Sequence, residues 1–121
     1  MKLSIQHADL YNPLQAVSRS IAAKPQLPVL ANILLQTEQN YLKISATNLE
    51  VGIIKKIAAE ILEEGEITIP AKVFTEIISS LAGEKISLES SADQLKIETS
   101  SFSGFILITV PFPFFFAGIG H

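Results

Sequence analysis

Residues 33–47 read ILLQTEQNYLKISAT, and this stretch decides the fold. Ile33, Leu35 and Thr37 alternate with Leu34, Gln36 and Glu38. After the polar pair Gln39-Asn40, Leu42, Ile44 and Ala46 alternate with Lys43, Ser45 and Thr47. Period-two alternation around a short polar break predicts a β-hairpin. Asn40 accepts a left-handed backbone at low cost, but no glycine lies beside it, so the turn type stays open.

The same pattern recurs about fifty residues later, where residues 88–97 repeat the apolar positions of residues 35–44. In each half a short strand and an amphipathic helix precede the hairpin. The two predicted apolar stripes are Leu10, Leu14, Val17 and Ile21, and then Val73, Phe74, Ile77, Ile78 and Leu81. Chance similarity is an alternative for the hairpins alone, but two matching pieces in the same order argue against it. Each half therefore predicts strand, helix, strand, strand, strand, and the chain predicts an α+β fold of two repeats.

The composition is that of a globular protein, with 121 residues, 48% hydrophobic and 17% charged. This length suits one domain with a real core. Cysteine is absent, which excludes disulfides and thiolate metal sites. The net charge of −3 argues against a protein that grips nucleic acid by charge alone. Polar residues near the N-terminus interrupt the apolar run that a signal peptide would need. No apolar run approaches the roughly 20 residues of a membrane span. We therefore expect a cytoplasmic location and no membrane partner.

In the first half, the helix is expected to start near Asp9, whose carboxylate can cap the free amides. Pro13 fits only a first turn, which predicts a late or irregular start. Two prolines hold residues 24–28 as an extended loop, and this loop can be a spacer or an added functional segment. Residues 49–61 are expected to form one further strand. The adjacent pair Ile53-Ile54 predicts burial on both faces or a bulge.

In the second half, Glu63-Glu64-Gly65-Glu66 is interpreted as the solvated joint between the repeats, because consecutive acids on a loop are seldom metal ligands. Pro70 is placed to open the second helix and Gly83 to end it. Further strands are expected near residues 85–89, 94–99 and 102–110.

No catalytic constellation is present. His7 and His121 lie near opposite ends without an acid at ligand spacing, and we interpret both as surface residues. The sequence has no nucleophile elbow, phosphate loop, zinc motif or EF-hand motif. We therefore expect no enzyme activity, no catalytic residue, no metal and no cofactor.

Several strings resemble the first domain of the bacterial sliding clamp, the beta subunit of the replicative DNA polymerase III. The matching strings lie at residues 1–3, 14–18, 27–35, 46–53 and 69–72. Asn48 replaces an aspartate common in that family, and both residues suit a turn. The resemblance implies a DNA-clamp domain at residues 1–110, with two helices on one side and antiparallel sheets on the other. Two further domains of the family are missing.

The resemblance also implies a mechanism without bond chemistry, in which a homodimeric ring encircles duplex DNA and tethers the polymerase. Sliding requires weak, sequence-independent phosphate contacts. Lys24 and Lys72 stand at positions where the family contacts DNA. Arg19, on the polar face of the first helix, is a further candidate from its pattern alone. Residues 102–104 lack the arginines that many relatives carry there, which implies a weaker contact.

The same resemblance assigns the dimer interface to Val73, Ile77, Phe105 and Leu107, although ordinary core positions are the alternative. The polymerase subunits and the clamp loader are expected to bind through the missing domains. Residues 111–121 hold four of the seven phenylalanines and no charge, so they depart from the family. We interpret this tail as the product of a truncation or an altered reading frame. The competing hypothesis for the whole chain is a small α+β interaction module with no role on DNA.

Overall fold

The computed structural model describes residues 1–22, 32–47, 52–81 and 83–108. The elements in chain order are β1 (Lys2–Gln6), α1 (His7–Ala22), β2 (Asn32–Glu38), β3 (Tyr41–Thr47), β4 (Gly52–Ala58), β5 (Glu60–Glu63), β6 (Glu66–Pro70), α2 (Ala71–Ser80), β7 (Lys85–Ser90), β8 (Gln94–Glu98) and β9 (Ser103–Leu107). Both predicted hairpins are present, and the first turns at Gln39-Asn40, with Glu38 paired to Tyr41.

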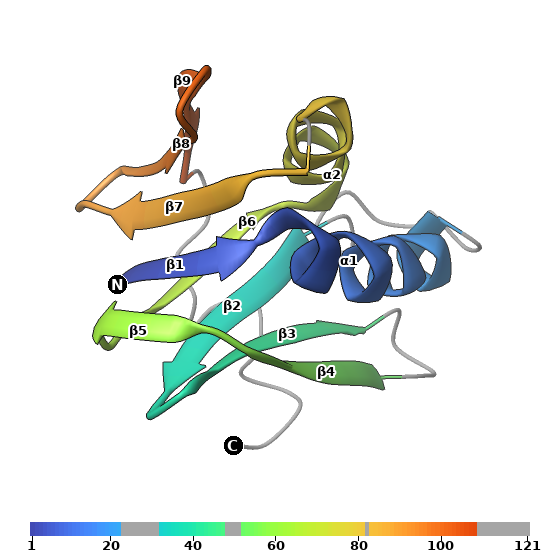
Figure 1. The fold of residues 1–121 in the computed structure, drawn as a ribbon. Helices are drawn as coiled ribbons and strands as arrows, with labels where there is room; N and C mark the ends of the chain where they lie inside the picture. The colour runs from blue at the N-terminus through green and yellow to red at the C-terminus, as the bar shows by residue number, and fades with distance from the viewer. Residues whose placement is uncertain (23–31, 48–51, 82, 109–121) are drawn as a thin grey trace.

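The strands form two antiparallel sheets, and the two helices lie side by side against them (Figure 1). Sheet A has the strand order β5-β1-β7-β8-β9, and sheet B has the order β4-β3-β2-β6. Each repeat sends its first strand to the sheet built on the other repeat's hairpin. Strand β1 pairs with β7, and β6 pairs with β2. The predicted two-repeat α+β architecture is confirmed, and the exchanged strands make the repeats one folding unit.

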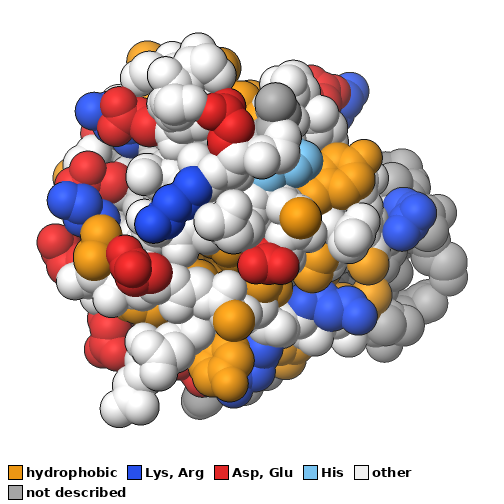
Figure 2. All heavy atoms as spheres, in the orientation of Figure 1, with side chains coloured by type: hydrophobic (Ala, Val, Ile, Leu, Met, Phe, Trp, Pro, Cys, Tyr) orange, Lys and Arg blue, Asp and Glu red, His pale blue; other side chains and the backbone are white. Residues whose placement is uncertain are grey.

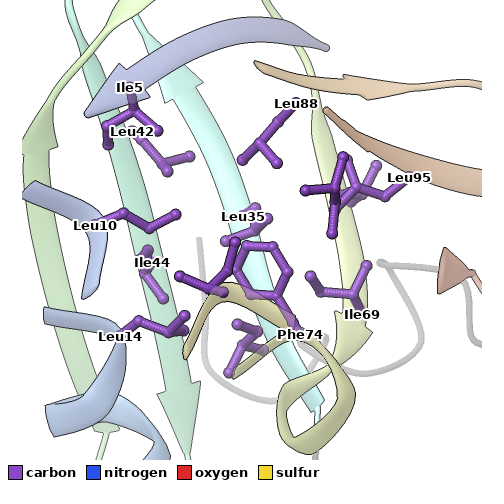
Figure 3. Packing of buried hydrophobic residues seen from close by; sticks show 14 of the residues in the cluster. Ile5, Leu10, Leu14, Leu35, Leu42, Ile44, Ile69, Phe74, Leu88 and Leu95 are labelled. Atoms are coloured by element: carbon purple, nitrogen blue, oxygen red, sulfur yellow. The ribbon is translucent and has the colours of Figure 1, made fainter. Parts of the chain in front are cut away.

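One apolar core fills the space between the sheets and the helices, and Phe74 lies near its centre (Figure 3). Leu10 and Leu14 of α1 correspond to Phe74 and Ile78 of α2, and all four are fully buried. The alternate residues of the strands point into the same core, as the period-two pattern predicts. The buried strand residues include Leu3, Ile5, Ile33, Leu35, Leu42, Ile44, Ile67, Ile69, Ile86, Leu88, Leu95 and Ile97.

The predicted start of the first helix is wrong. Helix α1 begins at His7 and continues through Pro13, so Asp9 lies inside the first turn instead of capping it. Pro13 lacks the N–H that would bond to the carbonyl of Asp9, which costs on the order of 3 kcal/mol. The helix nevertheless buries Leu10, Leu14 and Val17 completely. Each such side chain contributes about 1.5–3 kcal/mol, so packing outweighs the proline.

The predicted strand over residues 49–61 is two strands, since β4 ends at Ala58 and β5 begins at Glu60. Strand β4 pairs with β3 in sheet B, whereas β5 pairs with β1 in sheet A. The expected burial or bulge at Ile53-Ile54 is also wrong. Ile53 packs against the core and Ile54 is exposed, which is the ordinary alternation of an edge strand.

At the joint between the repeats, Gly65 lies very close to the N-terminal residue Met1. A Cβ on Gly65 would lie 2.9 Å from the backbone nitrogen of Met1, so only glycine fits there. The buried Met1 is held by its carbonyl, which accepts a 2.8 Å hydrogen bond from the Ser90 N–H. At the end of the second helix, α2 stops at Ser80, before the predicted terminator Gly83.

Candidate functional site

Two polar contacts join the helices along one seam. The hydroxyls of Ser18 and Thr75 lie 2.6 Å apart, and the Gln15 amide donates to the Ser79 hydroxyl at 3.0 Å. Residue numbers rise along α1 as they fall along α2, so the helices run antiparallel. This seam was not predicted from the sequence. Its signal is the pair of polar residues at helical spacing on each helix, Gln15 and Ser18 on α1 and Thr75 and Ser79 on α2.

The candidate cations Arg19 and Lys72 lie at the same end of the helix pair. Arg19 follows Ser18, and Lys72 stands one turn before Thr75, the residue that Ser18 contacts. Both side chains are exposed, and neither forms an ion pair with another described residue. They are therefore free to contact phosphate groups. Lys24 lies outside the described residues.

The helices carry as many acids as bases. Asp9 lies in the first turn of α1, at the end of the pair away from Arg19, and Glu76 stands one turn after Lys72. The helix surface is therefore neutral as a whole and cationic only where α1 ends and α2 begins. Acidic and basic side chains are also interspersed on the face shown in Figure 2. This surface favours weak phosphate contacts over tight ones.

Strand β9 forms an open margin of sheet A, because among the described residues it pairs with β8 alone. The Ile108 N–H donates to the Asp93 carbonyl at 2.8 Å. Successive N–H groups of a strand point to opposite sides, so those of Phe105 and Leu107 point to the open margin. Their side chains are 59% and 54% exposed. Backbone donors and apolar side chains together make this margin suitable for pairing with another strand.

The other two interface candidates lie on α2 and differ from each other. Val73 is 43% exposed, so its predicted place in the buried stripe is wrong. Ile77 is half-buried and packs against the core. The ordinary-core alternative therefore fails for Val73, Phe105 and Leu107. Figure 1 shows α2 and β9 at the same end of the molecule.

A polar cluster surrounds Glu84, at the turn before β7. The Ser100 hydroxyl donates to one oxygen of the Glu84 carboxylate, and the Ser101 hydroxyl donates to the other at 3.0 Å. These hydrogen bonds, that of Ser100 first, lower the pKa of the Glu84 carboxyl below its usual 4.5. Within the part of the chain that the structure describes, Glu84 forms no ion pair, and its hydrogen bonds join the turn before β7 to the turn before β9.

His7 is half-buried, so its interpretation as a surface residue is wrong. Its Nε2 donates to the Ile78 carbonyl at 2.8 Å, and its ring stacks on Tyr11. The ring therefore ties the start of α1 to the end of α2. Across the described ranges, no three potential ligands gather into a metal site, and neither helix is long and apolar enough to cross a membrane.

Comparisons with known proteins agree on one family. A family model described as DNA polymerase III beta subunit, N-terminal domain, matches residues 1–114. The beta sliding clamp of Vibrio harveyi is 38% identical over 115 residues, which are 92% of this chain and 77% of that protein. The beta sliding clamp of Vibrio cholerae is 37% identical over 113 residues, which are 92% of this chain and 31% of that protein.

Solved structures give the same result. The DNA polymerase sliding clamp from Caulobacter crescentus superposes with a TM-score of 0.83 at 35% identity. The match covers 92% of this chain and 30% of that one. The DNA polymerase III subunit beta from Pseudomonas aeruginosa gives a TM-score of 0.82 at 32% identity, with the same coverage. The chain thus spans about a third of these solved chains and of the Vibrio cholerae relative.

Proposed function

The chain belongs to the DNA polymerase III beta subunit family, matching its N-terminal domain, and from this premise we propose that it is the first domain of a sliding clamp. In that role it catalyses no reaction. It closes a ring around duplex DNA and thereby tethers the replicative polymerase to its template. The observation that carries the proposal is the open margin of β9, where Phe105 and Leu107 lie more than half exposed.

Ring closure matters because topological linkage replaces affinity. A protein with a net charge of −3 repels DNA overall, yet a closed ring holds DNA without strong contacts. We assign the ring contact to β9 and to Val73 and Ile77 on α2, with a partner domain continuing sheet A. Pairing along an edge, reinforced by an apolar cluster, is a sound way to join subunits in a closed assembly.

Arg19, Lys72 and Lys24 would supply the phosphate contacts. The free cations Arg19 and Lys72 support this assignment, because they lie together at one end of the helix pair. Each neutralised phosphate contributes about 0.9 to the slope of log affinity against log salt on duplex DNA. Three such contacts give a slope of only about 2.7 and weak binding, which suits sliding.

A salt titration with a fluorescent duplex of mixed sequence tests the DNA assignment. We expect weak binding at low salt that does not depend on sequence. Arg19→Gln with Lys72→Gln should lower the salt slope by about 0.9 per lost contact. Glu76→Gln on the same helix surface is the matched variant and should strengthen binding. Tight sequence-specific binding, or a slope that the cation substitutions leave unchanged, would contradict the proposal.

The second candidate is an interaction module without a role on DNA. The equal numbers of acids and bases on the helices favour it. It shares the β9 margin with the first candidate and differs only in the helix surface. Association through β9, together with no salt-dependent binding to DNA at low salt, would select this alternative.

A further inference from the structure

One contact of the helix seam leaves hydrogen-bond donors available on the surface. The Gln15 side-chain amide has two N–H groups, and one of them donates to the Ser79 hydroxyl oxygen at 3.0 Å. The second amide N–H and the Ser79 O–H remain, and within the described part of the chain neither donates to another group. Ser79 is exposed and Gln15 is half-buried. The pair therefore presents two neutral donors on the helix surface.

The neighbouring hydroxyl groups differ in this respect. The partly buried hydroxyls of Ser18 and Thr75 bond to each other across the seam at 2.6 Å. The Ser80 hydroxyl, next to Ser79, donates back to the Ile77 carbonyl of its own helix at 2.7 Å. The Ser80 donor is thus used inside the domain, whereas the pair of Gln15 and Ser79 keeps donors for an external acceptor.

Gln15 and Ser79 occupy equivalent positions in the two repeats. Leu10 corresponds to Phe74, and each residue of the pair lies five positions further along its helix. The exchange of the first strands is reciprocal, β1 with β7 and β6 with β2, as a local two-fold axis requires. Equivalent residues that contact each other lie at such an axis. The pair therefore lies at the middle of the two side-by-side helices (Figure 1).

The pair also continues the cationic end of the helix surface. Arg19 stands one turn after Gln15 on α1, and Lys72 stands two turns before Ser79 on α2, on the same side of each helix. Two turns of helix advance about 10.5 Å, whereas one DNA strand advances about 3.4 Å per nucleotide. The distance from Lys72 to Ser79 therefore spans about three nucleotides. Cations and neutral donors along this line all favour an anionic oxygen as their acceptor.

We propose that Gln15 and Ser79 form a neutral phosphate-binding pair, in which the free Gln15 N–H and the Ser79 O–H donate to a backbone phosphate of duplex DNA. Amide and hydroxyl side chains are common donors to phosphate oxygens, and such contacts carry no sequence information. The inference rests on the proposed clamp function and adds a contact that no charge supplies.

A neutral contact behaves differently from a cationic one. It replaces no condensed counterion on the DNA, so it does not contribute to the salt slope. The Glu76 carboxylate stands one turn before Ser79 and repels phosphate, so the attraction at the middle of the helices stays weak. The pair therefore orients the DNA backbone without gripping it, and Arg19 and Lys72 supply the part of the affinity that depends on salt.

A salt series of fluorescence anisotropy with the 121-residue chain and a mixed-sequence duplex tests the pair. Gln15→Ala and Ser79→Ala should each lower the binding constant by about threefold to tenfold at every salt concentration and leave the salt slope unchanged. Ser79→Thr keeps the hydroxyl and should bind as the unmodified chain does. Ser80→Ala, whose hydroxyl is used inside α2, is the matched control and should have no effect.

The outcomes separate the pair from the clamp function. Unchanged affinity in both Gln15→Ala and Ser79→Ala, or an equal loss in Ser80→Ala, overturns the phosphate-binding role of the pair and leaves the clamp function standing. A fall in the salt slope of the alanine variants also overturns this role, because a neutral donor does not contribute to the slope. No binding by the unmodified chain at low salt overturns both the clamp function and the pair.

Disulfide crosslinking gives a second readout, because the chain has no cysteine of its own. Ser79→Cys is mixed with a duplex that carries an activated thiol tether on one backbone phosphate. Ser87→Cys is the control, because Ser87 is exposed on sheet A between the buried residues Ile86 and Leu88. We expect Ser79→Cys to crosslink about tenfold faster than Ser87→Cys, since binding raises the local concentration of the tether. Equal crosslinking rates overturn the proposal.

Discussion

Strand β4 in the first repeat and strand β9 in the second occupy equivalent places, each at the outer margin of its sheet. Lys56 of β4 pairs with Lys43, whereas Phe105 of β9 pairs with Lys96, the residue equivalent to Lys43. The Lys56 ammonium lies 3.1 Å from the Glu38 carboxylate and 5.3 Å from the centre of the Tyr41 ring. The β4 margin thus combines a charged contact at Lys56 with one exposed apolar side chain, Ile54. The β9 margin instead exposes the two apolar side chains Phe105 and Leu107.

The interior positions of the repeats show no such difference. Leu10 and Phe74 occupy equivalent buried positions on their helices, and Leu42 and Leu95 are buried at the second position of the second strand of each hairpin. Close packing constrains every interior position, because lost volume there costs stability. A margin residue touches little of its own domain. The residues of the two margins could therefore differ in type, according to what each edge strand contacts.

The largest expected effect tests the shared interior. Phe74→Ala should destabilise the fold by about 3–5 kcal/mol, and Leu10→Ala by about 2–5 kcal/mol, because each leaves a cavity in the common core. Urea denaturation followed by circular dichroism measures both. Val73→Ala, next to Phe74 but exposed, is the control and should change stability by no more than about 0.5 kcal/mol. An equal loss of stability in Val73→Ala would show that Val73 contributes to the core as much as Phe74 does.

The next effect tests the margins. Phe105→Lys should weaken association with a chain that carries the two other clamp domains by about 2 kcal/mol, roughly thirtyfold, because it places a charge in an apolar contact. Native mass spectrometry and calorimetry measure the loss. Lys56→Ala on β4 is the matched change and should alter association by less than about 0.5 kcal/mol. Equal losses from both variants would remove the functional distinction between the margins.

Two threonines of sheet B differ in the hydrogen bonding of their hydroxyls. Thr68→Val should stabilise the fold by about 1 kcal/mol, because it removes a buried hydroxyl without a partner. Thr37→Val should destabilise it by about 1 kcal/mol, because the Thr37 hydroxyl accepts from the Gly65 N–H at 2.8 Å. Thermal melts of both variants check the opposite signs. A loss of stability in Thr68→Val would mean that its hydroxyl has a partner in solution.

The smallest effect concerns the acid side of the pH profile. The folded state lowers the Glu84 pKa below 4.5, so its stabilising contribution is complete above that pH. The contribution is lost as the pH falls through the folded pKa. Ser100→Ala with Ser101→Ala should bring the carboxyl titration, followed by NMR, back toward 4.5. Ser91→Ala, at an exposed turn of the same sheet, should leave the Glu84 pKa unchanged. A shift of the Glu84 pKa in this variant would mean that the effect does not depend on the hydrogen bonds from Ser100 and Ser101.

Several elements could be predicted because their evidence is local. The alternation around Gln39-Asn40 identified the first hairpin, and helical spacing identified Leu10 and Leu14 as core residues. The family resemblance, and not the pattern, supplied Lys72 and Phe105 as site candidates. Pattern alone also assigned Val73 to the core, because helical spacing does not show where a buried stripe ends.

By itself the sequence determined which residues can be buried and how the two halves repeat. Those properties depend on the periodicity of one strand or one helix. Only the tertiary structure decided that β5 leaves sheet B for sheet A, that Arg19 and Lys72 share one end of the helix pair, and that Leu34 is buried while Ser87 is exposed. Each of these results depends on contacts between residues far apart in the chain, and no local pattern specifies such contacts.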